Sequence, residues 1–448
     1  MRLLDPLFTS DRTQEIFSDE ARLQRMLDFE AALARALVRA EIAPQSAAAA
    51  IEAQCDAKRF SMDALSRSAA LAGNLAIPLV KELTALVVNV DEKAAGFVHY
   101  GATSQDAIDS GLVLQLRDAF DDTAGQLARL SELLRRLAAE NQDVVVAGRT
   151  WLQQASPVTL GSKCSAWLDA IERHRERLAE TRKRVEVLQF GGAVGTLAAL
   201  GASAGKVTEA LAAELKLAVP DIPWHAQRDR MAEVATTYGL ITGTLGKIAR
   251  DISLMSQTEI GELAEPSAAG RGGSSTLPQK RNSVGCSVVL AAAIRVPPLV
   301  ATMLSAMVQE HERGLGGWQA EWETLPEICL VSAGALSHLI QVLGKLEIHA
   351  DAMARNLGAT KGLIMAEAVS MALAKHIGKM PAHRLVEQAA HRALDSGKPF
   401  LETLAAENEI TRYLSKEELT ALLDPKSYTR SAHAVVDRVL AASKKNLR

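Results

Sequence analysis

The central part of the sequence repeats apolar residues at helical spacing over long stretches, and this limits the fold more than any other feature. No proline occurs between Pro78 and Pro157. Across residues 110–141, leucine and alanine recur every three or four positions, which predicts one helix of about 45 Å. Such a helix cannot bury its apolar stripe against a small core, so several long helices must pack together.

Capping signals predict where the other helices begin and end. Ser18, followed by Asp19 and Glu20, is expected to start a helix that ends before Pro44. Further long helices are expected from Ser156-Pro157 to Gly191-Gly192, from about Ala226 to Gly261, from about Val284 with a kink at Pro297-Pro298, and from about Pro326 to Leu346.

The same patterns predict the fold class and its division into domains. Aromatic residues make up only 4% of the chain, and long alternating apolar and polar stretches are missing, so no sizeable sheet is expected. We predict an all-α protein with three consecutive domains. These are a small N-terminal helical domain at residues 1–107, a central bundle of long helices at 108–350, and a small C-terminal helical domain at 351–448.

Charge and cysteine usage exclude several classes of function. With 50 basic and 53 acidic residues, the net charge is -3, so neither nucleic acid nor a membrane surface is expected as a partner. The four cysteines are far apart and form no CxxC pair, which indicates buried thiols in a reducing compartment. We find no signal-peptide pattern and no run of about 18 apolar residues, so we expect a cytoplasmic protein without a transmembrane helix.

Motifs for metals and nucleotides are also missing. The histidines have no HExxH spacing, no GxGxxG follows a strand, and no GxxxxGK[ST] occurs. We therefore expect no metal and no nucleotide cofactor.

A glycine-rich loop at residues 266–283 separates two predicted helices. It contains three glycines and the adjacent Ser274 and Ser275, and it ends with Lys280, Arg281 and Asn282. Glycines let backbone N–H groups approach an anion closely, and the cations and the amide add donors. On composition alone, a solvated linker is an equally good interpretation.

Two other segments matter for the site. Residues 98–106 include Thr103 and Ser104, whose hydroxyls either bind a carboxylate or cap a helix that begins near Gln105. Residues 148–159 contain Arg149, Thr150, Trp151 and Gln153.

These three segments resemble the conserved regions of the fumarase/aspartase superfamily, and they occur in the same order. The loop sequence GSSTLPQKRN at 273–282 is similar to the family signature and departs from it only at Leu277, where the signature has Met. The resemblance implies a fumarase/aspartase-like fold and a cofactor-free enzyme that acts on a small polycarboxylate. It also implies a homotetramer whose active sites are shared among subunits.

The departures from the family pattern indicate the reaction. Many members have His at the position of Trp151, paired with a Glu at the position of Ser287. Because both halves of this pair are missing, the chain resembles the lactone-forming cycloisomerase branch, in which a substrate carboxylate adds to a double bond of the same molecule. That match extends through residues 148–153, 190–201, 223–230 and 311–326.

Three alternatives stay open at this point. A C–N lyase similar to adenylosuccinate or argininosuccinate lyase is supported by residues 227–230 and 311–313. A cycloisomerase for a sulfonated substrate would use the same donors. A non-catalytic structural protein on the same fold is disfavoured by the complete loop.

The resemblance assigns roles to single residues. Ser274 would handle the carbon-bound proton, with His99 as a second candidate and Lys280 as an anion holder. Arg228 and Arg313 would clamp carboxylates, although surface ion pairing is the competing interpretation. The predicted substrate-binding residues are Thr103, Ser104, Arg149, Thr150, Trp151, Gln153, Ser275, Asn282, Arg228, His311 and Arg313.

Overall fold

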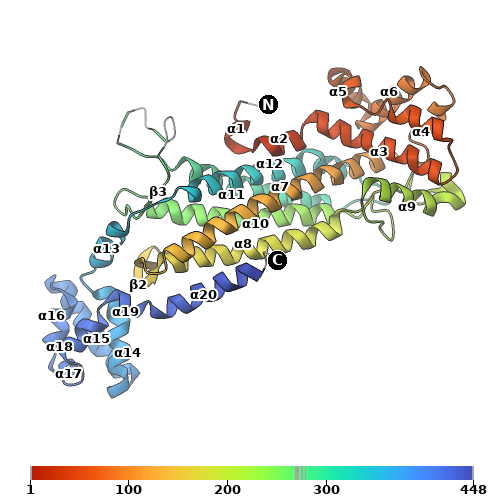
Figure 1. Ribbon diagram of the computed structural model, residues 1–448. Helices are drawn as coiled ribbons and strands as arrows, with labels where there is room; N and C mark the ends of the chain where they lie inside the picture. The colour runs from red at the N-terminus through yellow and green to blue at the C-terminus, as the bar shows by residue number, and fades with distance from the viewer. Residues whose placement is uncertain (1–2, 268–271, 274–275, 278, 446–448) are drawn as a thin grey trace. The chain divides into compact units, whose positions relative to one another are not determined.

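The structure, a computed structural model, confirms the predicted fold class, because almost all of its regular elements are helices (Figure 1). It describes residues 3–267, 272–273, 276–277 and 279–445. The five long helices are α7 (Ser104–Glu140), α8 (Leu160–Val185), α10 (Asp229–Met255), α11 (Val284–Ala306) and α12 (Gly317–Gly344).

Shorter elements precede, connect and follow these helices. Towards the N-terminus lie α1 (Asp5–Phe8), α2 (Asp11–Ile16), α3 (Asp19–Arg39), α4 (Gln45–Glu52), α5 (Met62–Ala72) and α6 (Ala76–Val88), and α9 (Ala204–Leu215) follows α8. Towards the C-terminus lie α13 (Ala350–Gly358), α14 (Ala366–Ile377), α15 (Lys379–Ser396), α16 (Phe400–Ala405), α17 (Asn408–Thr411), α18 (Lys416–Leu422), α19 (Pro425–Tyr428) and α20 (Arg430–Lys445). The strands are β1 (Val145–Thr150), β2 (Gln153–Thr159), β3 (Leu263–Ala264) and β4 (Glu347–Ile348), paired as two antiparallel two-stranded sheets.

The chain divides into two compact units, each built from three separate segments. Unit 1 comprises Met1–Leu127, His174–Leu245 and Val288–Ser337, and unit 2 comprises Ala128–Arg173, Gly246–Ser287 and His338–Arg448. All five long helices contribute residues to both units. The division into three consecutive domains stays a prediction.

Buried polar contacts join the long helices within unit 1. The Thr123 hydroxyl of α7 lies 2.9 Å from the Tyr238 hydroxyl of α10, and Thr242 of α10 lies 2.8 Å from Ser332 of α12. Each contact pairs buried hydroxyls of two different helices. Apolar residues fill the space around them, so the helices pack as the sequence pattern predicts.

The predicted start of the first long N-terminal helix is confirmed. The Ser18 side chain accepts a hydrogen bond from the Ala21 backbone N–H at 3.1 Å, and α3 begins at Asp19. This is the N-cap arrangement that the sequence indicates.

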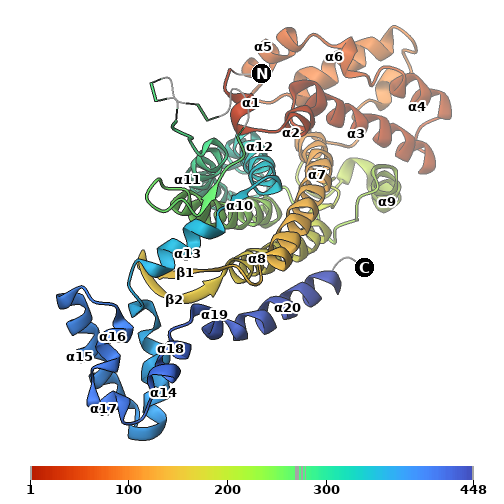
Figure 2. The same ribbon diagram turned by 60° about the vertical axis from the view of Figure 1, so that its left-hand side comes forward.

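The predicted helix start at Ser156-Pro157 is wrong. These residues lie in β2, which pairs with β1 as a hairpin (Figure 2). The helix cap is Thr159, whose Oγ1 accepts the Ser162 backbone N–H at 3.0 Å. The predicted end at Gly191-Gly192 is also wrong, since α8 ends at Val185.

Pro326 does not start a helix either, because α12 begins at Gly317 and Pro326 lies inside it. Proline fits the first turn of a helix best, but it also occurs inside helices at the cost of one backbone hydrogen bond. The two prolines Pro297 and Pro298 lie inside α11, as predicted.

Two helices, α11 and α12, are long and apolar enough to cross a membrane by length and composition alone, although the sequence analysis expects no such span. Of the apolar window in α12, 61% is buried within the chain, whereas only 33% of the window in α11 is buried. The helix α11 therefore keeps an apolar face, including Ile294 and Leu304, that the chain itself does not cover.

Candidate active site

The N-terminus of α7 is held in place by one buried carboxylate, that of Asp106. This side chain is fully buried. It accepts five hydrogen bonds of 2.8–3.1 Å, from the backbone N–H groups of Thr103, Gly191 and Gly192 and from the side chains of Gln189 and His225. Asp106 thereby fastens the loop at 190–196 to the turn that carries the predicted Thr103-Ser104 pair.

This loop needs glycine because the backbone approaches its neighbours closely. A Cβ on Gly191 would lie 2.7 Å from Pro223 Cβ, and one on Gly192 would lie 2.9 Å from the Gly101 carbonyl oxygen. Gly192 also has a φ of +65°, which glycine adopts without strain. The glycine-rich sequence near 191 is thus a loop that docks beside Asp106.

Arg313 joins three of the predicted segments within unit 1. Its Nε donates to Gln105 Oε1 at 2.9 Å. Its Nη2 donates to the Ala193 carbonyl at 3.1 Å and to Thr103 Oγ1 at 3.4 Å. The guanidinium is otherwise exposed, and Ser104 begins α7 beside Thr103. A cation next to the first N–H groups of a helix suits a carboxylate.

His99 makes a close pair with Glu30 of α3. The ring Nδ1 lies 2.6 Å from Glu30 Oε1, and the His99 backbone N–H donates to Glu30 Oε2 at 3.1 Å. Burial disfavours the charged ring, but the charge and hydrogen bond of Glu30, with a contribution from Asp106, raise the pKa of His99 above its ordinary value. A protonated His99 is consistent with its predicted role as a donor.

Arg228 does not face a surface that a substrate could reach. It is 2% exposed and lies between two carboxylates. Its Nη1 donates to Asp109 at 2.7 Å, and its Nη2 donates to Glu321 at 2.5 Å. Burial raises the pKa of Glu321 despite this arginine. The geometry argues against the predicted clamp. Arg228 instead binds Asp109, which also accepts a hydrogen bond from the Gln105 side chain.

His311 lies at the surface just before Arg313, and its φ is +50°. That conformation is uncommon for a residue with a Cβ, and such residues cluster at functional sites. His311 therefore stays a candidate for substrate contact.

Arg149, in unit 2, is also held by a buried carboxylate. Its Nη1 and Nη2 donate to Glu262 at 2.9 and 2.7 Å, and the Asn356 amide donates to the same carboxylate at 2.8 Å. Glu262 is fully buried. Because two donors of the guanidinium bind Glu262, Arg149 supports the β1–β2 hairpin and does not present these donors to a substrate.

The hairpin tip is an exposed pair of bulky residues, Trp151 and Leu152. They connect the paired residues Thr150 and Gln153, which are also exposed. Trp151 is 97% exposed, and the φ values of Trp151 and Leu152 are +53° and +64°. Two-residue hairpin turns of this kind favour Asn-Gly, so a Trp-Leu pair here carries strain and presents an apolar surface.

The signature loop in unit 2 is only partly within the described residues. Ser274 and Ser275 lie outside them, while Lys280 and Asn282 are exposed. The loop's final turn is anchored by Arg281, which donates to Glu347 at 2.7 Å and to the Glu265 carbonyl at 2.6 Å. At the position of the family's Glu, the Ser287 hydroxyl donates to the Val284 carbonyl and offers no carboxylate.

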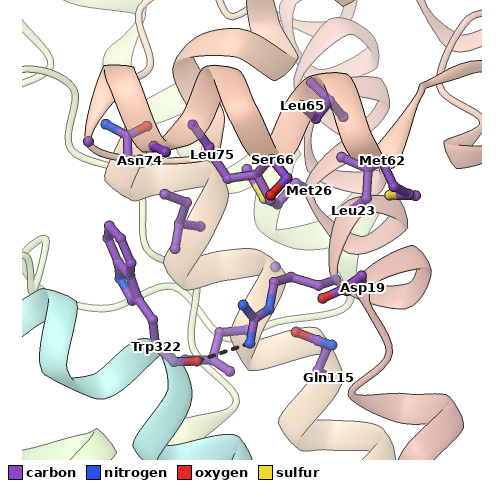
Figure 3. A pocket seen from close by; sticks show the side chains of 17 residues that line it. Asp19, Leu23, Met26, Met62, Leu65, Ser66, Asn74, Leu75, Gln115 and Trp322 are labelled. Carbon is purple, nitrogen blue, oxygen red and sulfur yellow. Dashed lines mark hydrogen bonds between the residues drawn. The ribbon is translucent and has the colours of Figure 1, made fainter. Parts of the chain in front are cut away.

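A separate cavity of about 500 Å³ lies in unit 1 (Figure 3). Its walls come from α3, α5, α7 and α12 and are mainly apolar, with Leu23, Met26, Leu65 and Trp322 among them. No predicted site residue lines it. Over the described ranges of the chain, no three His, Cys, Asp or Glu side chains gather as metal ligands would.

The fold and the matched segments define a class of mostly helical enzymes, the lyases. Residues 8–297 match the family described as Lyase, and residues 362–439 match the family described as Adenylosuccinate lyase C-terminus. The chain belongs to the fumarase/aspartase superfamily of lyases.

Its relatives include enzymes of one named activity. Over 98% of its length the chain is 54% identical to the 3-carboxy-cis,cis-muconate cycloisomerase of Pseudomonas aeruginosa, of which it covers 96%. It is 46% identical to the protein of that name from Acinetobacter baylyi, over 99% of both chains. The crystal structure of 3-carboxy-cis,cis-muconate lactonizing enzyme from Pseudomonas putida matches with a TM-score of 0.95 at 50% identity, over 100% of both chains.

Sequence reasoning missed the buried residues that support the predicted ones. The sequence could have indicated Asp106, because an acidic residue three positions after Thr103 has the spacing of a capping box. Nothing in the sequence indicates Glu30, since it lies 69 positions from His99. Gln105 and His225 lie in matched segments and Gln189 directly precedes one, but nothing in the sequence indicates that these residues are buried partners.

Proposed function

We propose that the protein is a 3-carboxy-cis,cis-muconate cycloisomerase that forms a carboxymuconolactone in the breakdown of protocatechuate. The observation that carries this is similarity along the whole chain to enzymes of that name, at 46–54% identity. The departures at Trp151 and Ser287 agree with it, because a reaction whose nucleophile is internal needs no His–Glu pair to activate water.

The chemistry requires folding of the substrate and stabilisation of one anion. A carboxylate oxygen forms a bond to an alkene carbon, and the π electrons move into the conjugated carboxylate as an enediolate. A proton then bonds to the adjacent carbon. The trianionic substrate and one proton give a dianionic lactone. Holding the nucleophile against the alkene supplies much of the acceleration.

The residues divide into anion holders and a proton carrier. Lys280, Asn282, Thr103, Ser104 and Arg313 are proposed to hold the carboxylates, and each donor placed on the enediolate contributes about 3 kcal/mol. Ser274 is the leading proton carrier by resemblance, with His99 as the second candidate. The remaining proposed contacts are Ser275, Thr150, Trp151, Gln153 and His311.

The decisive experiment follows the ultraviolet absorbance of 3-carboxymuconate on adding pure enzyme in the presence of a chelator and without nucleotides. The absorbance should fall, and an unbuffered solution should lose one proton per molecule converted. No turnover would overturn the proposal. Release of fumarate from adenylosuccinate would favour the C–N lyase alternative, and faster turnover of a sulfonated muconate would identify the other cycloisomerase.

We also propose a cytoplasmic homotetramer with active sites shared between protomers. The tetramer and its shared sites follow from the resemblance, and two observations support association between copies of the chain. The apolar residue Trp151 is almost fully exposed at a strained hairpin tip, and α11 keeps an uncovered apolar face. Both are expected where another copy of the chain packs.

A further inference from the structure

The Glu30 carboxylate is buried, and both of its oxygens contact His99. It lies on α3 and is 2% exposed. A buried carboxylate without partners is costly. Here one oxygen accepts the His99 backbone N–H at 3.1 Å and the other faces the ring Nδ1 at 2.6 Å. One carboxylate therefore fixes both the backbone and the ring of His99.

The backbone of His99 needs this support. Its φ of +56° lies in the left-handed region, which costs energy for a residue with a Cβ. The next helix begins only five positions later at Ser104. Glu30 thus holds a strained turn directly before the Thr103-Ser104 pair.

The contact also decides which ring nitrogen is available. An ionised Glu30 can only accept a hydrogen bond, so Nδ1 is assigned as the donor in this contact. Nε2 is then the atom left to meet a substrate, and the side chain is 16% exposed. The other charged group that acts on the ring is Asp106 of α7, which is itself bonded to His225. Both neighbouring carboxylates favour the doubly protonated ring.

We propose that Glu30 is a positioning residue that orients His99 so that a cationic Nε2–H points at the enediolate of the bound substrate. This rests on the proposed cycloisomerase function. The chain lacks the family's His–Glu pair at Trp151 and Ser287, and it has instead an imidazole–carboxylate pair drawn from α3 and the turn before α7. In this role His99 stabilises negative charge by hydrogen bonding and need not transfer its proton.

Kinetics of four variants test the proposal: Glu30→Gln, Glu30→Asp, His99→Gln and the double variant of Glu30→Gln with His99→Gln. Glu30→Gln should lower kcat on the order of 10-fold or more at pH 8, with little change in KM, and move the alkaline limb of the pH profile to lower pH. Glu30→Asp should restore part of both. In the His99→Gln background, Glu30→Gln should cost nothing further. An unmoved pH profile, or an equal loss in both backgrounds, overturns the proposal.

A second measurement does not depend on turnover. Diethyl pyrocarbonate acylates a histidine ring only when the ring is neutral, so the rate of modification at His99 itself, followed by mass spectrometry across pH, reports the ring's titration. Glu30→Gln should lower the midpoint by about one pH unit or more. An unchanged midpoint in a variant with a native circular dichroism spectrum overturns the role of Glu30. If the wild type fails to convert 3-carboxymuconate but the midpoint still moves, the proposed function fails and the Glu30–His99 coupling stands.

Discussion

Arg313 shows how much a single exposed side chain organises in unit 1. It bonds to Gln105, Ala193 and Thr103, and lysine cannot reproduce that forked geometry. We predict that Arg313→Lys lowers kcat/KM on the order of 100-fold, with the free energy of unfolding nearly unchanged. Steady-state kinetics and urea unfolding measure the two effects.

The matched control is Arg12→Gln, which removes a cation from an exposed pair with Glu15. Surface pairs of this kind contribute little, so its kinetics should equal those of the wild type. Full activity of Arg313→Lys would contradict a role for the guanidinium fork.

His99 gives a prediction about pH and stability. Its pKa is raised in the folded state by Glu30 against the opposing effect of burial. The stabilisation is therefore fully present below the ordinary histidine pKa of about 6.5 and is lost as pH rises through the raised folded pKa. The difference in unfolding free energy between wild type and His99→Gln should shrink from pH 5 to pH 9.

The comparison variant for this measurement is His383→Gln, because His383 is exposed on α15. Its difference from the wild type should stay flat across the same range. A His99 difference that grows with pH would contradict the pairing.

The sequence indicates a residue's role only where that role depends on its neighbours in the chain. The predictions for Thr103, Ser104 and Lys280 rest on motifs a few residues long. Glu30 and the burial of Arg228 depend on contacts between distant helices, and Arg228 takes its second carboxylate from Glu321, 93 positions away. No periodicity in the chain encodes such a pairing, so the sequence predicted Arg228 as a carboxylate clamp, with surface ion pairing as the alternative.

At the scale of elements, the tip of the β1–β2 hairpin is predicted to lower stability and yet to be needed for activity. Trp151 and Leu152 occupy left-handed backbone positions at its tip. Replacing both by Asn-Gly should relieve strain of about 1 kcal/mol or more, leave the unfolding free energy equal or higher, and reduce kcat/KM on the order of 100-fold. Thermal unfolding and kinetics together check this.

Leu152→Gly alone is the matched control, since it relieves strain at one position and keeps Trp151. It should retain activity. If the Asn-Gly variant were as active as the wild type, the exposed tryptophan would have no part in the reaction.

The same hairpin explains why the helix start at Ser156-Pro157 was predicted wrongly. Ser156-Pro157 has the local signature of a helix start, and Thr159 has it too. Pairing of β2 with β1 decided between them, because Pro157 is opposite Ala147 in the ladder. The cap at Ser18 has no such competitor and was predicted correctly.

At the scale of the whole molecule, the uncovered face of α11 predicts the assembly. Ile294 is 72% exposed in the single chain. Light scattering during gel filtration should give about four times the protomer mass of 47.9 kDa. Ile294→Glu should give a smaller species, because a charge cannot be buried unpaired at an interface. Leu71→Glu, at a residue 93% exposed on α5, is the control and should leave the mass unchanged.

Shared active sites make a further prediction that the mass cannot test. Arg313→Gln removes a group of unit 1 and Lys280→Met removes a group of unit 2, so each variant alone should be nearly inactive. If every site combines these groups from different protomers, coexpressed hybrids contain some sites with both residues intact, and activity returns. Two tags, purified in sequence, select the hybrids before the absorbance assay. Hybrids as inactive as the single variants would show that Arg313 and Lys280 of the same protomer serve the same site.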